Sequence, residues 1–176
     1  MYDFINIKKY NYSPIYQNIE MVIFSLAGFF IPLFLGHPQI LVGTIVNAAL
    51  ILAAIHLKGY RSLPVIIMPS LGVLCRGLIF GPFTPYLIYM IPFIWFGNFL
   101  LVFSFKNFKL NYWLKLSIGI FLKVGFLFTM ALIFYKLGLL PVIFLTAMGI
   151  LQVTTALLGG IAAFSYEKIN QKFFSY

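Results

Sequence analysis

Residues Gly36 to Tyr60 read GHPQILVGTIVNAALILAAIHLKGY. Almost every residue in this stretch is apolar, and its length is close to the about 20 residues that an α-helix needs to cross a bilayer. Asn47 nevertheless stands near the middle, and Lys58 follows the apolar part. The stretch therefore predicts a membrane-spanning helix that carries a buried amide, whose partner must be found elsewhere in the chain.

The composition extends this prediction to the whole chain. The 176 residues are 62% hydrophobic and 9% charged, whereas soluble domains are about 45–50% apolar and about 25% charged. A water-soluble fold could not bury so much apolar surface, so lipid is the expected solvent. The net charge of +9 is attributed to Lys and Arg in cytoplasmic loops rather than to nucleic-acid binding.

Apolar runs separated by breaks that contain Pro and Gly predict an all-α polytopic membrane protein. We expect one transmembrane domain over 1–176, with an interfacial segment at 1–19, a helical bundle at 20–165 and a cytoplasmic tail at 166–176. The first apolar run is expected to be retained, because no small-residue cleavage site follows it. The six expected transmembrane helices are 21–35, 38–57, 63–80, 85–105, 113–135 and 140–164.

The distribution of Lys and Arg predicts the orientation of the bundle. Basic residues occur in the N-terminal segment, in the second-to-third and fourth-to-fifth connections and in the C-terminal tail, whereas the other three loops together offer only Lys136. Because cytoplasmic loops carry the Lys and Arg excess, both termini are expected to be cytoplasmic.

Five polar or charged residues fall inside the predicted spans, one on each of the second to sixth helices: Asn47, Arg76, Asn98, Lys123 and Gln152. Four of them share a helix face with a nearby small residue, as Asn47 does with Gly43, because residues three or four apart lie on one face. Small residues let helices approach closely or leave room for a ligand. These side chains are therefore expected to point into the bundle.

The two cations in this set need an explanation. The chain has only three acidic residues, Asp3, Glu20 and Glu167, and none falls within the predicted spans. Lys123 would lie about 15 Å into its helix at 1.5 Å per residue. Burying an unpaired charge is expensive, so Arg76 and Lys123 either bind backbone carbonyls, extend toward the membrane surface or bind a ligand.

The sequence gives no support for catalysis or for a resident cofactor. His37 and His56 stand at opposite ends of one predicted helix, and the glycines form no phosphate loop. The single cysteine, Cys75, cannot hold an iron–sulfur cluster. No catalytic residue, metal ligand or cofactor is therefore predicted, and the protein is not expected to be an enzyme.

Four stretches resemble a known family of small prokaryotic membrane proteins: GHPQILVGTIVNAALILAA (36–54), MPSLGVLCRGLIFGP (68–82), IPFIWFGNFLLVF (91–103) and GILQVTTALLGGIAA (149–163). They are similar to the substrate-binding S components of energy-coupling factor (ECF) transporters. The resemblance implies a solute pocket facing outward in the prokaryotic cytoplasmic membrane. It also implies two partners, a membrane coupling subunit and a pair of cytoplasmic ATPases.

Two functions remain open at this point. The first is a solute-binding subunit of an uptake transporter for a small, vitamin-like and anionic solute. The second is a noncatalytic membrane scaffold in which the buried polar residues only hold helices together. For the first we expect Arg76 to hold the anion, the amides to set the orientation of the solute, and Lys123 to belong to the substrate-binding residues as well. Three aromatic residues of the fourth helix, Tyr86, Tyr89 and Trp95, are expected to cover the apolar part of the solute.

Overall fold

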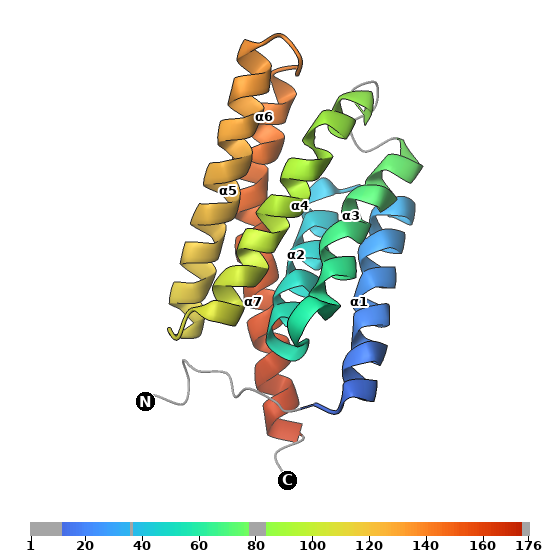
Figure 1. Ribbon diagram of the computed structural model, residues 1–176, viewed down its shortest axis with the longest axis vertical. Coiled ribbons are helices and arrows are strands. Elements are labelled where there is room, and N and C mark those ends of the chain that lie inside the picture. The colour runs from blue at the N-terminus through green and yellow to red at the C-terminus, as the bar shows by residue number, and fades with distance from the viewer. Residues whose placement is uncertain (1–11, 36, 78–83, 174–176) are drawn as a thin grey trace.

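The computed structural model describes residues 12–35, 37–77 and 84–173. Every regular element in these ranges is a helix (Figure 1), which confirms the all-α prediction. Residues 1–11, the last three positions of the third expected span (78–80) and the end of the expected tail (174–176) lie outside the described residues. The elements are α1 (Pro14–Phe34), α2 (Gln39–His56), η2 (Gly59–Ser62), α3 (Leu63–Arg76), α4 (Thr84–Asn107), α5 (Tyr112–Lys136), α6 (Ile143–Met148) and α7 (Ile150–Phe173).

Five helical segments are long and apolar enough to cross a membrane, as expected of an integral membrane protein: Pro14–Phe34, Gln39–His56, Tyr86–Asn107, Tyr112–Lys136 and Ile143–Lys172. The described part of the third expected span, α3, has 14 residues, which is shorter than the about 17 that a span requires.

The last expected helix, 140–164, is not continuous. It is split into α6 and α7 at Gly149, whose backbone has φ −99° and ψ −103°. A side chain at this position would meet the carbonyl oxygen of Leu145 at 2.7 Å and the ring of Phe128 at 3.1 Å. The break therefore occurs where the chain packs too closely for any residue but glycine.

Both ends of the bundle extend beyond the expected limits. α1 begins at Pro14, where the hydroxyl of Ser13 accepts a hydrogen bond from the amide of Tyr16 at 3.3 Å. The residues from 14 to 19 are thus the first turns of a helix. At the other end, α7 continues to Phe173, so most of the expected tail is helical.

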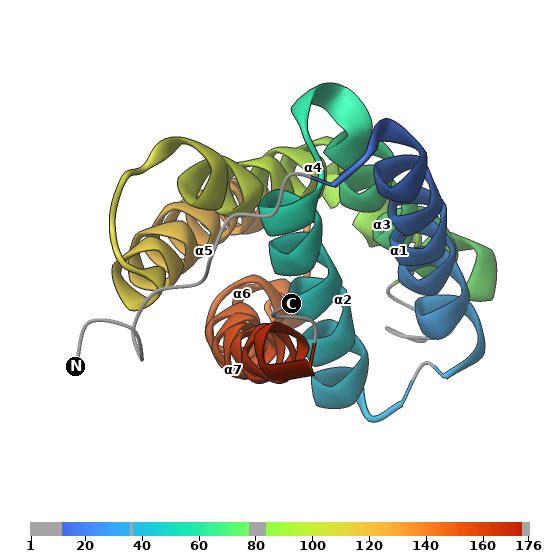
Figure 2. The same ribbon diagram turned by 90° about the horizontal axis from the view of Figure 1, so that it is seen from below.

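α2 lies at the centre of the bundle, in contact with α1, α4 and α7 (Figure 2). Its contact with α7 is close because both helices present small residues. A Cβ atom on Gly159 would lie 2.8 Å from the carbonyl oxygen of Thr44, and one on Gly43 would lie 2.7 Å from Thr155 Cγ2. This spacing brings Asn47 on α2 within reach of α7.

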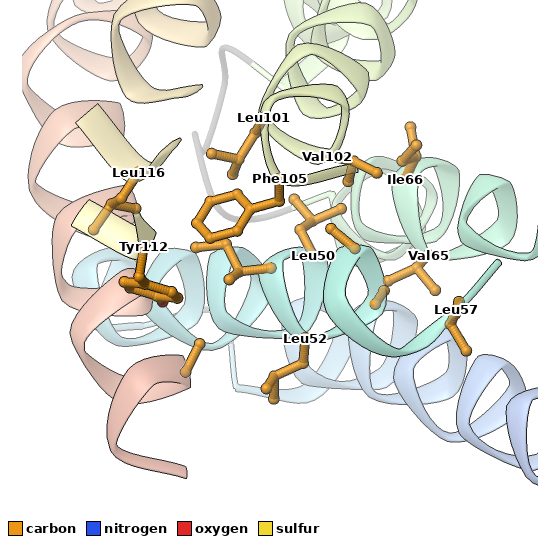
Figure 3. Packing of buried hydrophobic residues seen from close by; sticks show 14 residues of the cluster. Leu50, Leu52, Leu57, Val65, Ile66, Leu101, Val102, Phe105, Tyr112 and Leu116 are labelled. Atoms are coloured by element: carbon orange, nitrogen blue, oxygen red, sulfur yellow. The ribbon is translucent and has the colours of Figure 1, made fainter. Parts of the chain in front are cut away.

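Two apolar clusters fill the bundle at opposite ends. Near the ends of α1 and α7 that face the chain termini, side chains of α2, α3, α4 and α5 pack together, including Leu50, Val65, Phe105 and Leu116 (Figure 3). At the opposite end, Phe144 of α6 packs in a second cluster with residues of α4 and α5. The pocket described below lies between α2 and the helices that carry this second cluster.

The described basic residues are distributed unequally between the two ends. Those that follow α2, join α4 to α5 and end α7 lie at the end where α1 begins, whereas Arg76 and Lys136 lie at the other end (Figure 1). This arrangement agrees with the expected orientation, in which the end carrying the start of α1 is cytoplasmic.

The orientation predicts which loops accept a label from outside the cell. In a Cys75→Ala background, a cysteine replaces either Leu137, which is 64% exposed, or Tyr60, which is 77% exposed. A membrane-impermeant maleimide should label the Leu137→Cys variant in intact cells and the Tyr60→Cys variant only after permeabilisation. The opposite pattern would invert the orientation.

Candidate functional site

Asn47 joins three helices through its side-chain amide. Its Nδ2 donates to the carbonyl oxygen of Gly43 at 2.9 Å and to Thr155 Oγ1 on α7 at 3.2 Å. Its Oδ1 accepts from Lys123 Nζ on α5 at 2.6 Å. With a side chain that is almost fully buried, Asn47 thus uses both donors and its acceptor inside the bundle. The amide in the apolar stretch is explained by these contacts.

Lys123 is buried eleven residues into α5, about 16 Å from its start. Only 2% of the residue is exposed. Among the described residues no carboxylate lies within ion-pair distance of it, since the ion pairs found there all involve His56. The amide oxygen of Asn47 is a neutral acceptor, so no described residue compensates the charge of Lys123 in its protonated form, and that form has further N–H donors without a described acceptor.

The Asn47–Lys123 pair borders a pocket of about 120 Å³. The pocket lies in the half of the bundle away from the start of α1, because its wall includes residues near the end of α1 and the starts of α2, α4 and α7. The lining residues are Pro32, Gln39, Val42, Gly43, Val46, Asn47, Pro69, Ser70, Val73, Leu87, Ile94, Asn98, Lys123, Ala147, Met148, Leu151, Gln152 and Thr155.

Four of the predicted site residues meet at this pocket: Asn47, Asn98, Lys123 and Gln152. Asn98 is held by a hydrogen bond from its Nδ2 to the carbonyl oxygen of Ile66 at 3.2 Å. The half-buried Gln152 lines the wall without a hydrogen bond from its side chain to any described residue. The structure thus brings together residues from four different helices, as their positions within the spans predicted.

Arg76 does not line the pocket. It is the last residue of α3, and Gly77 ends the helix in the left-handed conformation at φ 68°. The guanidinium Nη1 of Arg76 donates to the carbonyl oxygen of Leu33 on α1 at 2.9 Å. Arg76 is thus bound to a backbone carbonyl, one of the alternatives that the sequence left open.

The three aromatic residues of α4 do not line the pocket either. Leu87, Ile94 and Asn98 share the face of α4 that does, and this spacing places Tyr86 and Tyr89 on other faces, where they are 38% and 53% exposed. Trp95 does not line the pocket, but its Nε1 donates a hydrogen bond to the pocket residue Ser70 at 2.6 Å.

Sequence reasoning missed three polar residues of the pocket wall, Gln39, Ser70 and Thr155. Thr155 is three residues after Gln152, so its place on the same face of α7 was open to prediction. Ser70 gave no comparable signal, because a hydroxyl in a helix usually bonds the backbone of its own helix. Gln39 gave none either, because it stands at the start of its helix, where a polar residue is ordinary.

A second buried polar cluster ties α1, α2 and α7 together near the start of α1. His56 Nδ1 lies 2.8 Å from Glu20 Oε1, and His56 Nε2 lies 2.5 Å from Glu167 Oε1. All three side chains are at least nine-tenths buried. The expectation that no acid lies in the spanning helices was wrong, because α1 and α7 run farther than their apolar runs and carry both glutamates inward.

Tyr12 covers this Glu20–His56–Glu167 cluster. Its ring lies edge-on to the imidazole with centroids 5.1 Å apart. Burial, together with the carboxylates of Glu167 and Glu20, raises the pKa of the Tyr12 phenol above its ordinary value. The cluster is therefore shielded from water on the side from which the chain enters α1.

The contacts of the Glu20–His56–Glu167 cluster predict how its residues affect the stability of the protein. A His56→Leu variant leaves two carboxylates buried beside each other without a partner, which should lower the free energy of unfolding by about 3–5 kcal/mol. Replacing all three members by leucine removes the charges together, so the triple variant should unfold at a higher temperature than His56→Leu. Thermal unfolding in detergent measures both. A His56→Leu variant as stable as the wild type would show that the Glu20–His56–Glu167 cluster does not hold the three helices together.

Comparison with protein-family models, with curated proteins and with solved structures gives no match for this chain. Any functional proposal therefore depends on the residues and geometry described above.

Proposed function

We propose that the chain is the solute-binding membrane subunit of an uptake transporter of the energy-coupling factor type. The observation that carries the proposal is the pocket of about 120 Å³ bordered by a buried lysine that forms no ion pair with any described residue. A bound solute would occupy the space and complete the hydrogen bonds of the lysine. The resemblance of the four sequence stretches to S components supports the same function.

The size and lining of the pocket suit a small molecule. An apolar cavity of about 150 Å³ accommodates one benzene molecule, so a pocket of about 120 Å³ suits a group of about that size or smaller. Small-molecule sites combine apolar walls with a few polar groups that fix the orientation of the ligand. Asn98, Lys123 and Gln152 supply such groups here.

The proposal includes partner proteins. The sequence has no phosphate-binding loop, so energy for uptake against a gradient must come from other chains. By resemblance to S components, these are a membrane coupling subunit and two cytoplasmic ATPases in a prokaryotic cytoplasmic membrane. In the expected orientation the pocket lies in the outer half of the bundle, on the side from which a solute would arrive.

The scaffold alternative is favoured by different contacts. The amide of Asn47 bonds three helices, and the Glu20–His56–Glu167 cluster bonds three as well, so polar residues do hold this bundle together. A scaffold, however, has no use for a cavity next to an unneutralised cation. Solute binding accounts for both features.

Blocking the pocket should abolish solute binding without unfolding the protein. Ala147 is buried on the pocket wall, and an Ala147→Phe substitution places a ring in the cavity. The matched control is Ala162→Phe, at an exposed position of α7. Mass spectrometry of small molecules released from the purified proteins should find one solute with the wild type and with Ala162→Phe, and none with Ala147→Phe. Equal retention by both variants, or no solute in any sample, would contradict the proposal.

A further inference from the structure

Some hydrogen-bond donors of the pocket wall already have an acceptor within the protein, and others do not. Lys123 has three N–H groups, and one of them bonds Asn47 Oδ1. Asn47 has no donor left, because Gly43 and Thr155 accept both. Two N–H groups of Lys123 on α5 and the side-chain amide of Gln152 on α7 are therefore available to a solute. The side-chain amide of Gln39 and the second Nδ2 hydrogen of Asn98 also line the pocket without a bond to a described residue.

The pocket wall contains one ionisable side chain, and its charged form is positive. Among the described residues that line the pocket, Lys123 is the only charged side chain. A solute with one negative charge would neutralise it, whereas a dianion would leave a net negative charge in a low-dielectric site and a neutral solute would leave the ammonium group unpaired. Both alternatives are costly in such surroundings.

Most of the remaining wall is apolar. Side chains of five helices form it, namely Val42, Val46, Val73, Leu87, Ile94, Met148 and Leu151. These side chains offer no hydrogen-bond partner, so the part of the solute that contacts them must be apolar as well. The volume of about 120 Å³ limits this part to the size of one six-membered ring or a short branched chain.

We infer that the solute is a monocarboxylate with a compact apolar body, whose carboxylate binds Lys123 through one oxygen and Gln152 through the other. The inference rests on the proposed solute-binding function and specifies its ligand. In this arrangement Asn47 is a positioning residue, because its amide oxygen holds the ammonium group at the pocket wall and its own N–H groups are already bonded. Arg76 takes no part in binding.

The experiment compares acids with amides of the same shape. Purified protein is titrated with benzoate and benzamide, cyclohexanecarboxylate and its amide, and 3-methylbutanoate and its amide, and the shift in unfolding temperature is measured. At least one acid should bind the wild type at least about tenfold more tightly than its amide, because only the acid pairs with the ammonium charge. The preference should disappear in Lys123→Met and weaken in Gln152→Leu.

Lys136→Met is the matched control, since this exposed lysine lies on the same helix, at the end nearer to the pocket. It should keep the preference, which separates binding at Lys123 from general attraction of anions. If Lys136→Met loses the preference as completely as Lys123→Met, the assignment to Lys123 is wrong.

A second measurement needs no variant and covers the case in which Lys123→Met does not fold. Solute released from wild-type protein is identified by mass spectrometry. A single-carboxylate compound supports the inference. A neutral or doubly charged solute overturns it while leaving the solute-binding function in place. If no solute is released and no acid in the panel stabilises the protein, both the inference and the proposed function fail.

Discussion

The hydrogen bonds of Asn47 are the interaction on which the site depends. They form because α2 and α7 approach closely at Gly43 and Gly159, which brings Thr155 to the amide nitrogen and leaves the amide oxygen for Lys123. Without that oxygen the lysine would have no fixed acceptor in the bundle interior. One neutral side chain thus determines where the charge lies and which wall of the pocket it faces.

The two ends of the bundle differ in whether a buried charged side chain has a partner of opposite charge. Near the start of α1, the charges are opposite in sign and bonded to one another, with His56 between Glu20 and Glu167. At the pocket, Lys123 has only a neutral partner among the described residues. In the first arrangement both glutamates bond the same histidine and three helices are joined, whereas in the second no described residue supplies an opposite charge. This contrast is the physical reason to separate a structural cluster from a binding site in a chain with so few charges.

Much of the architecture and part of the site followed from the sequence. Apolar runs located the helices, and the rarity of polar residues within them made Asn47, Asn98, Lys123 and Gln152 conspicuous. The predictions that failed concern the ends of helices and contacts between distant residues. Arg76 lies at the last residue of α3, so it bonds α1 instead of facing the pocket. His56 is 36 positions from Glu20 and 111 positions from Glu167 in the sequence, and no local sequence pattern indicates such contacts. Gly149 interrupts a helix at a point where Leu145 and Phe128 leave no room for a side chain, which sequence periodicity does not reveal.

The most direct test of the account is an experimental structure of the protein purified together with its solute. The account predicts non-protein density in the pocket, within about 3 Å of Lys123 Nζ, with Asn47 Oδ1 still bonded to the lysine on its other side. A pocket closed by its own side chains, or a Lys123 whose ammonium group has turned away from Asn47 and the cavity, would contradict it.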